Sequence, residues 1–305
     1  MVPKRTRALR HRLAPAALQL LLWLSASLPL RASHALGSWF GWLAWRLGGK
    51  SVAITERNLA LCFPEMTAEQ HRQLTRSSFI ETGKTLMEVG ALWRWPRQKI
   101  MQLAVEVSGR ELIDEAIATG QGVILAAPHL GAWEMSGLYW SAEYPITSLY
   151  RPPRLAAVEE PVHRGREHLG ATLVPTDAGG VRALLKALKQ GQIAGILPDQ
   201  EPPRDAGGVF APFFGTSAWT ITLLTRLAQK SGARVVLSYA ERLPKGRGFH
   251  IHVLPAPVDI ADQDPDRAAA ALNRGVEQCV RQLPHQYQWS YKRFRKRPAG
   301  QREIY

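Results

Sequence analysis

The stretch GVILAAPHLGAWE, residues 122–134, decides the fold class of this chain. Its first seven residues form an unbroken apolar run, which is typical of a strand buried on both faces. Strands of this kind belong to parallel sheets that helices cover. Further apolar runs at 146–150, 171–175, 193–198, 233–243 and 248–258 alternate with helical patterns. We therefore expect a single layered α/β domain with a mostly parallel central sheet flanked by helices.

The helical patterns lie between these runs and around them. Thr67-Ala68-Glu69-Gln70 has the form of a capping box and opens a predicted helix that runs to about residue 93. Further helices are predicted at 109–119, after 130, and at 154–169, 181–191, 217–230 and 266–283. We find no linker long enough to divide the 305 residues into two globular domains.

Two cysteines, Cys62 and Cys279, lie 217 positions apart. This spacing excludes a disulfide framework and a CxxC metal cluster. A reduced protein that faces the cytoplasm is the simplest interpretation.

The net charge of +14 is concentrated at the two ends of the chain. Residues 1–55 carry +8 without a single acid and residues 289–305 carry +5, so the 233 residues between them carry only +1. Basic ends on a nearly neutral body indicate attachment to an anionic surface. Nucleic acid is the competing partner, but the chain lacks the usual zinc-finger, RNP and glycine-rich signatures. We therefore expect a membrane surface and no nucleic acid.

The N-terminal segment contains a hydrophobic stretch at residues 13–30 that is marginally long enough to span a bilayer. A removed secretory signal is the alternative, because Ser33-His34-Ala35 resembles a cleavage site. Tryptophans continue beyond that point, at 39, 42 and 45, and tryptophan favours the headgroup region. We expect an uncleaved membrane-anchor helix and an interfacial segment within residues 1–50, the α/β domain at 51–288, and a basic tail at 289–305. Full crossing of the bilayer is left open.

The predicted site follows the first central strand, where ligands of open α/β sheets bind. His129 and Glu134 are five residues apart, so they can meet only if His129 lies in the loop and Glu134 in the first helical turn. Glu134 would then hold one ring nitrogen of His129 and leave the other as a general base. Without a nucleophile of its own, such a pair would activate a substrate hydroxyl. A structural histidine in a loop is the alternative.

Several further motifs occur in a fixed order. They are Arg57 through Glu65 (RNLALCFPE), His129 through Glu134, Tyr150-Arg151-Pro152, Leu197 through Gln200 (LPDQ), Pro212 through Gly215 (PFFG), and Tyr287 through Phe294. With these motifs the chain resembles the lipid A biosynthesis acyltransferase family, within the wider group of glycerolipid acyltransferases marked by H-x4-D/E. The resemblance covers nearly the whole chain.

The resemblance implies transfer of a fatty acyl group from acyl carrier protein to a hydroxyl of an anionic lipid A precursor. It implies the inner membrane, with the catalytic domain facing the cytoplasm, and neither a metal nor an organic cofactor. By this likeness His129 is the general base and Glu134 its orienting partner. Arg166 and Asp199 match functional positions of the family, with Arg164 as the alternative alignment for Arg166.

Each of these residues also has a plainer interpretation. Arg151 either contacts an anionic headgroup or stabilises the turn before Pro152, and Asp199 either belongs to the site or satisfies backbone donors in its loop. The basic cluster Lys292–Arg297 either binds the membrane, docks the carrier protein, or is a solvated tail. Acylation of another amphiphile, such as a lysophospholipid or a glycolipid, and a non-catalytic lipid-binding protein are the alternative functions. A metallohydrolase is disfavoured because no second histidine lies at metal-site spacing from His129.

Overall fold

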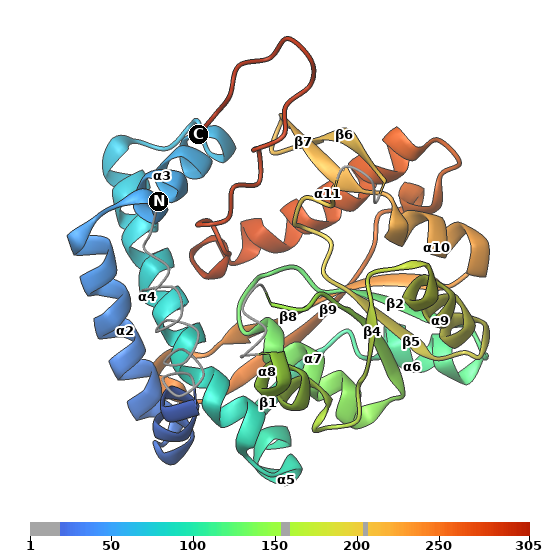
Figure 1. The fold of residues 1–305 in the computed structure, drawn as a ribbon, viewed down its shortest axis with the longest axis horizontal. Coiled ribbons are helices and arrows are strands. Elements are labelled where there is room, and N and C mark those ends of the chain that lie inside the picture. Colours follow the sequence, from blue (N-terminus) through green and yellow to red (C-terminus); the bar gives the residue numbers. More distant parts are fainter. Residues whose placement is uncertain (1–18, 154–158, 204–206) are drawn as a thin grey trace, which may run out of the picture.

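A seven-stranded sheet forms the centre of the chain in the computed structural model, which describes residues 19–153, 159–203 and 207–305 (Figure 1). The strand order is β1-β9-β8-β2-β5-β3-β4, and every pairing is parallel except that of β8 with β9. The bounds are β1 Ala104–Ser108, β2 Val123–Ala126, β3 Ile146–Tyr150, β4 Thr172–Pro175, β5 Ile193–Ile196, β8 Arg234–Arg242 and β9 Phe249–Pro255. The predicted α/β class with a mostly parallel sheet is confirmed.

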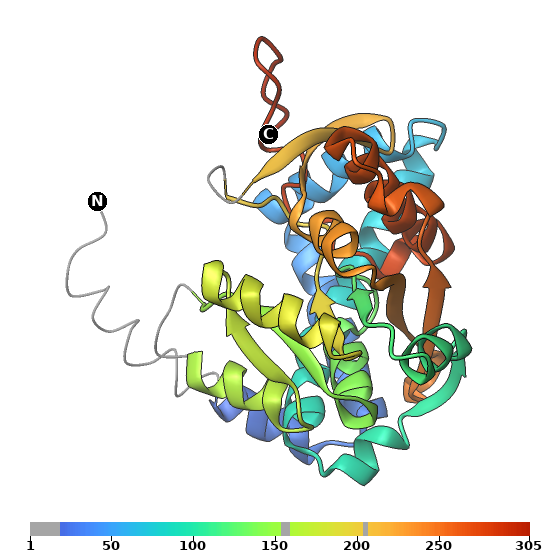
Figure 2. The same ribbon diagram turned by 90° about the vertical axis from the view of Figure 1, so that its right-hand side faces the viewer.

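Helices cover both faces of this sheet (Figures 1 and 2). On β2, Val123 and Leu125 pack toward α6 (Glu111–Ala118) and α7 (Trp133–Glu143). Ile124 and Ala126 point to the opposite face, where α9 (Ala178–Lys189), α10 (Leu223–Ser231) and α11 (Pro265–Gln282) pack. The unbroken apolar run thus fills two cores at once, because successive side chains of a strand point to opposite faces.

The segment 208–221 differs from the prediction, which placed a helix at 217–230. It forms an antiparallel hairpin of β6 (Gly208–Phe213) and β7 (Thr216–Ile221), and α10 begins only at Leu223. The two turn residues, Phe214 and Gly215, have φ angles of 48° and 73°. Positive φ at both positions is typical of the tight two-residue turns that match strand twist. Strand β1 was also not predicted.

Three N-terminal helices, α2 (Leu30–Leu47), α3 (Lys50–Cys62) and α4 (Ala68–Arg94), flank this body (Figure 1). The predicted capping box at Thr67 and Gln70 is present at the start of α4. Glycines bring α2 and α4 together, since a Cβ on Gly37 would lie 2.6 Å from the Gly83 oxygen and one on Gly41 only 2.1 Å from the Phe79 oxygen. Any larger residue there would push the helices apart.

No helix within residues 19–153, 159–203 and 207–305 is long and apolar enough to cross a membrane. The basic leader and the first residues of the predicted anchor lie outside the described residues. Residues 19–27 are helical, but the chain is extended at Pro29 (φ −57°, ψ 146°) before α2 begins. A proline has no N–H to continue a helix, so the predicted anchor helix across 13–30 is not supported.

The C-terminal segment is part of the core rather than a free tail. Trp289, Arg293 and Phe294 are almost completely buried. The Arg293 guanidinium donates hydrogen bonds to the Trp219 carbonyl at 2.7 Å and to Asn273 Oδ1 at 3.2 Å. One member of the predicted basic cluster is therefore a packing residue, while Lys292 and Arg295 remain exposed.

The remaining elements connect these layers. They are α5 (Arg97–Met101), α8 (Glu159–Glu167) and the short helices η3 (Pro244–Gly246), η4 (Val258–Ala261) and η5 (Pro284–Gln286). Residues 154–158, the start of the predicted helix before β4, lie outside the described residues.

Candidate active site

His129 lies in the loop that leaves β2 and enters α7. Neighbouring segments hold this loop through its backbone: Gly131 N donates to the Gln286 carbonyl at 3.0 Å, and Ala132 N donates to the Ala240 carbonyl at 2.8 Å. Gly131 has a φ of 61°, and a Cβ there would lie 2.0 Å from the Ala240 oxygen. Glycine is needed at this position both for its left-handed backbone and for the close approach.

Asp199, which follows β5 beside β2, binds His129 through two atoms. The backbone N–H of His129 donates to Oδ2 at 2.9 Å, and Nδ1 lies 2.8 Å from Oδ1. Burial would raise the pKa of Asp199, but the charge and hydrogen bonds of His129 hold it below its ordinary value. An ionised carboxylate only accepts hydrogen bonds, so in the neutral form of His129 the proton lies on Nδ1 and the lone pair on Nε2.

The lone pair on Nε2 faces a side-chain amide. Gln200 Nε2 lies 3.1 Å from His129 Nε2 and 3.2 Å from Gln288 Oε1, so one NH₂ group bridges both acceptors. The His129 side chain is 14% exposed. A substrate hydroxyl at this position would replace one neutral hydrogen bond, which costs little compared with breaking an ion pair.

Glu134 lies in the first turn of α7, as predicted, but it binds a different partner from the expected one. Among the described residues its carboxylate has no hydrogen bond or ion pair with His129. Arg166 on α8 instead donates to it through Nε at 3.1 Å and through Nη2 at 2.5 Å, and the Trp93 indole donates at 3.2 Å. The predicted His129–Glu134 contact is therefore wrong, because Asp199 occupies Nδ1 and Arg166 holds Glu134.

Burial and the neighbouring Arg166 act in opposite directions on the pKa of Glu134. Burial would raise the pKa of the Glu134 carboxyl, but the charge and hydrogen bonds of Arg166 hold it below its ordinary value. Arg164, the alternative alignment, is 79% exposed and pairs with Glu160. The geometry thus brings Arg166, and not Arg164, to Glu134.

A small cavity of about 80 Å³ lies beside this ion pair. Glu134 and Arg166 form its polar wall, and its apolar wall includes Trp133, Leu138, Leu149, Leu173 and Leu197. Arg151 follows β3 and is exposed at the same edge of the sheet, with no ion pair or hydrogen bond among the described residues. The carboxyl ends of β2, β5 and β3 therefore surround an apolar recess that has a charged rim.

Two contacts of this site had no counterpart in the prediction. Gln200 belongs to the LPDQ motif, and its place directly after Asp199 was the one available signal for its contact with His129. Trp93 lies at the end of α4, far from Glu134 in sequence, and nothing in the local pattern indicated it. One metal-type group occurs in the described part of the chain, Glu241, His250 and His252, and it does not include His129.

Comparison with known proteins places these motifs in one family. The sequence profile described as "Bacterial lipid A biosynthesis acyltransferase" matches residues 3–296. The chain is 33% identical to the lipid A biosynthesis lauroyltransferase of Escherichia coli K12 over 281 residues, which is 92% of this chain and 90% of the relative. It is 29% identical to the palmitoleoyltransferase of the same organism, covering 93% and 92%, and 26% identical to its myristoyltransferase, covering 87% and 81%.

The motif series, the position of the site at the strand ends and these matches agree. The resemblance and the enzyme class inferred from the sequence are confirmed: the chain belongs to the bacterial lipid A biosynthesis acyltransferase family.

Proposed function

We propose that this enzyme transfers a fatty acyl group from an acyl carrier protein thioester to a hydroxyl group of a lipid A precursor. The observation that carries the proposal is the His129–Asp199 pair, in which the second ring nitrogen of His129, Nε2, faces the replaceable amide of Gln200. The relatives named lauroyltransferase, palmitoleoyltransferase and myristoyltransferase support a fatty acyl donor and lipid A chemistry.

In this mechanism the acceptor hydroxyl takes the place of Gln200 at His129 Nε2. His129 removes the hydroxyl proton while the oxygen attacks the thioester carbonyl, so a carbon–oxygen bond forms. The tetrahedral intermediate then collapses, the carbon–sulfur bond breaks, and the imidazolium returns its proton to the departing sulfur. Asp199 keeps the proton on Nδ1 and stabilises the imidazolium, as the acid does in serine–histidine–aspartate triads.

Glu134 and Arg166 are assigned to substrate binding rather than to proton transfer. Arg166 uses Nε and Nη2 on Glu134, and within the described residues its Nη1 has no hydrogen bond. A guanidinium fixed in this way presents a directed donor to a phosphate of the acceptor. The adjacent cavity is apolar on one side and holds only part of an acyl chain.

The enzyme is proposed to lie on the cytoplasmic face of the inner membrane. Trp39, Phe40 and Leu47 of α2 are 53%, 49% and 77% exposed, and an apolar helix face of this kind favours the headgroup boundary. Basic residues near an anionic leaflet each add about 1 kcal/mol of attraction. In this proposal α2 binds the interface.

The test is a direct assay with full-length protein in detergent or lipid. The enzyme is incubated with acyl carrier protein thioesters of several chain lengths and a lipid A precursor, and the product is read by mass spectrometry. We expect the precursor to gain the mass of one acyl chain, and we expect none with His129→Ala. Acylation of a lysophospholipid in place of the lipid A precursor would overturn the proposed acceptor.

A further inference from the structure

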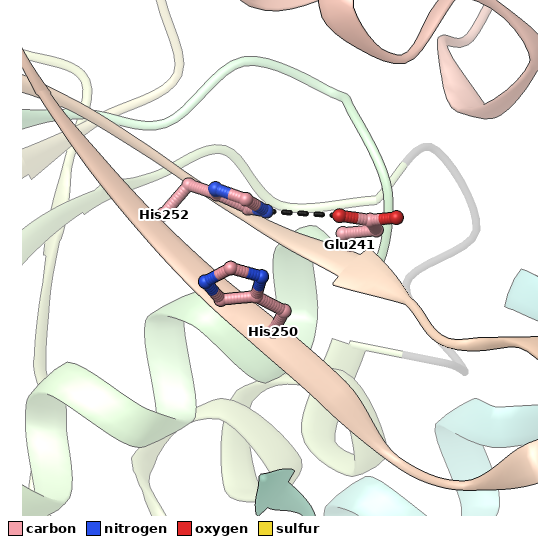
Figure 3. A group of neighbouring side chains, drawn as sticks. All are labelled: Glu241, His250 and His252. Carbon is pink, nitrogen blue, oxygen red and sulfur yellow. Dashed lines mark hydrogen bonds and ion pairs between the residues drawn. The ribbon is translucent and has the colours of Figure 1, made fainter. Parts of the chain in front are cut away.

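A second group of polar side chains, which does not include His129, lies on strands β8 and β9 (Figure 3). His250 and His252 alternate with Ile251, which is buried in the core. They share one face because side chains of a strand repeat every two residues. Glu241 pairs directly with His250 across the antiparallel ladder, so its Cβ is expected about 5 Å away. Strand geometry alone therefore brings two imidazoles and one carboxylate together.

The three side chains are already close to one another. Glu241 Oε2 lies 2.9 Å from His252 Nε2, and the two imidazole centroids are 3.8 Å apart. One ligand atom from each residue lies within 4.8 Å of the others. Their side chains are 15% to 31% exposed, so the group is sheltered but open to ions from solvent.

Neighbouring residues fix the orientation of both rings. Ser108 on β1 lies 2.7 Å from His250 Nε2, and Glu106 lies 3.5 Å from the same atom. These contacts occupy Nε2 and leave Nδ1 as the ligand nitrogen, which Figure 3 shows turned toward the Glu241–His252 pair. Tyr239 stacks on His252 with ring centroids 4.6 Å apart. Such outer contacts are what orients a metal-binding histidine and sets its tautomer.

We propose that Glu241, His250 and His252 bind a divalent transition-metal ion, with Zn²⁺ as the best fit. Two imidazole nitrogens and one carboxylate oxygen suit Zn²⁺, whereas Ca²⁺ and Mg²⁺ prefer oxygen ligands. Ligands 2.0–2.1 Å from a tetrahedral ion lie about 3.4 Å apart, so Glu241 and His252, now 2.9 Å apart, would separate slightly, and ligand atoms up to 4.8 Å apart would move inward. Water would complete the coordination.

The site would act on the structure and not on the acyl transfer step. The ion would tie β8 to β9, and β8 also carries Ala240, whose carbonyl accepts from Ala132 in the His129 loop. A metal bound here therefore stabilises the strand on which that loop is fastened. Among the described residues no hydrogen bond or ion pair joins the three ligands to His129 or Asp199.

The experiment measures Zn²⁺ binding to the full-length protein in detergent, by elemental analysis after gel filtration and by calorimetric titration. We expect the His250→Gln/His252→Gln variant to bind one fewer ion per chain than wild type. The matched control is His163→Gln, which removes an exposed histidine that lies 3.1 Å from Glu167. This control is expected to bind as wild type does.

A milder variant keeps the test decisive if the double variant does not fold. Ser108→Ala leaves all three ligands in place and is expected to weaken Zn²⁺ binding about 10-fold to 100-fold, because it removes an orienting contact. Co²⁺ added to wild type should give the visible absorption of a tetrahedral site, and that absorption should be lost in Glu241→Gln. Equal Zn²⁺ binding by wild type and the double variant, or unchanged affinity in Ser108→Ala, would overturn the proposal.

Discussion

Two regions of the molecule hold ionisable side chains in its interior, and they differ in how fully those side chains are paired. Around Arg242 on β8, Nε and Nη2 each bind Glu88 at 2.7 Å, and Nη2 also donates to Thr85 and to the Gly131 carbonyl. Arg242 and Glu88 are each 1% exposed at the side chain. At the strand ends His129 is similarly bound to Asp199, but its Nε2 has only the amide of Gln200.

This difference suits the fully paired Arg242 region to supporting the fold and the incompletely paired His129 region to binding a substrate. A buried charge with every polar atom paired cannot accept a substrate without a large penalty, because removal of one partner leaves an unpaired charge in a low-dielectric interior. His129 has one strong partner and one weak partner, so a hydroxyl can replace the weak one. The two regions are connected, since Arg242 binds Gly131, two residues after His129. The fully paired Arg242 network therefore holds in place the loop that carries His129.

The largest expected effect is on activity, in Asp199→Asn. An asparagine amide can donate to Nδ1, which moves the ring proton to Nε2 and removes the general base. We expect turnover in the acyl transfer assay to fall by about 10²–10⁴-fold with the fold retained. Asp177→Asn, at the start of α9, is the matched control and should keep full turnover, because asparagine also caps helices well. More than a tenth of wild-type turnover in Asp199→Asn would contradict the assigned role.

The next effect is on stability, in Arg242→Met. The variant removes the arginine shared by Glu88 and Glu81, which keep His34 and Lys84 as partners, so the free energy of unfolding should fall by about 3–5 kcal/mol. Denaturant titration with circular dichroism measures it. Arg164→Met on the exposed face of α8 is the control and should change stability by less than about 0.5 kcal/mol. Equal losses in both variants would show that the Arg242 network is not the support described above.

A smaller effect is expected for Arg166→Lys, which keeps the charge but loses the fork that binds Glu134. We expect the KM for a phosphorylated acceptor to rise about 10-fold while turnover at saturation changes little. The readout is the ratio of KM values for phosphorylated and dephosphorylated acceptors, with Arg164→Lys as control. If Arg166→Lys raises both KM values equally, Arg166 only supports Glu134 and does not bind the phosphate.

The smallest effect is a difference in acid sensitivity between wild type and Asp199→Asn. Because the pKa of Asp199 is lowered in the folded state, its contribution to stability is complete above its unfolded value near 4. That contribution is lost as the pH falls toward the lowered folded value. Between about pH 5 and pH 3 we therefore expect the unfolding free energy of wild type to fall more steeply than that of Asp199→Asn. Parallel curves would mean that Asp199 is not ionised against His129.

The sequence predicted best those parts of the fold in which a single strong pattern, such as a continuous apolar run, indicates one kind of element. The run at 122–128 indicated a strand buried on both faces, and β2 fills both cores. Strand β1 was missed because it is an exposed sheet element, with Val105 59% exposed and no clear alternation. The β6–β7 hairpin was missed because its turn places Phe214, a bulky residue, at positive φ. Backbone conformations of this kind depend on tertiary contacts, here the bond from Phe214 N to Glu277.

The sequence did not predict how the candidate site residues pair with one another. The short spacing of His129 and Glu134 favoured a direct contact, whereas the observed partner, Asp199, is 70 residues away, in the segment that follows the neighbouring strand β5. Adjacency of β2 and β5 brings the two together, and strand order cannot be read from local pattern. The burial of Arg293 was missed for the same reason, because its partners Trp219 and Asn273 are distant in sequence.

The docking of residues 287–296 onto the site has a consequence for the way the protein is made. Gln288 accepts a hydrogen bond from the side-chain amide of Gln200. The backbone N–H of Glu201 donates to the Tyr291 hydroxyl, and the carboxylate of Glu201 accepts from the backbone N–H of Lys296. During translation, the segment carrying His129 leaves the ribosome more than 150 residues before Lys296, which is needed for the last of these contacts. A nascent chain thus contains His129 early but can form these contacts beside it only after Lys296 has emerged.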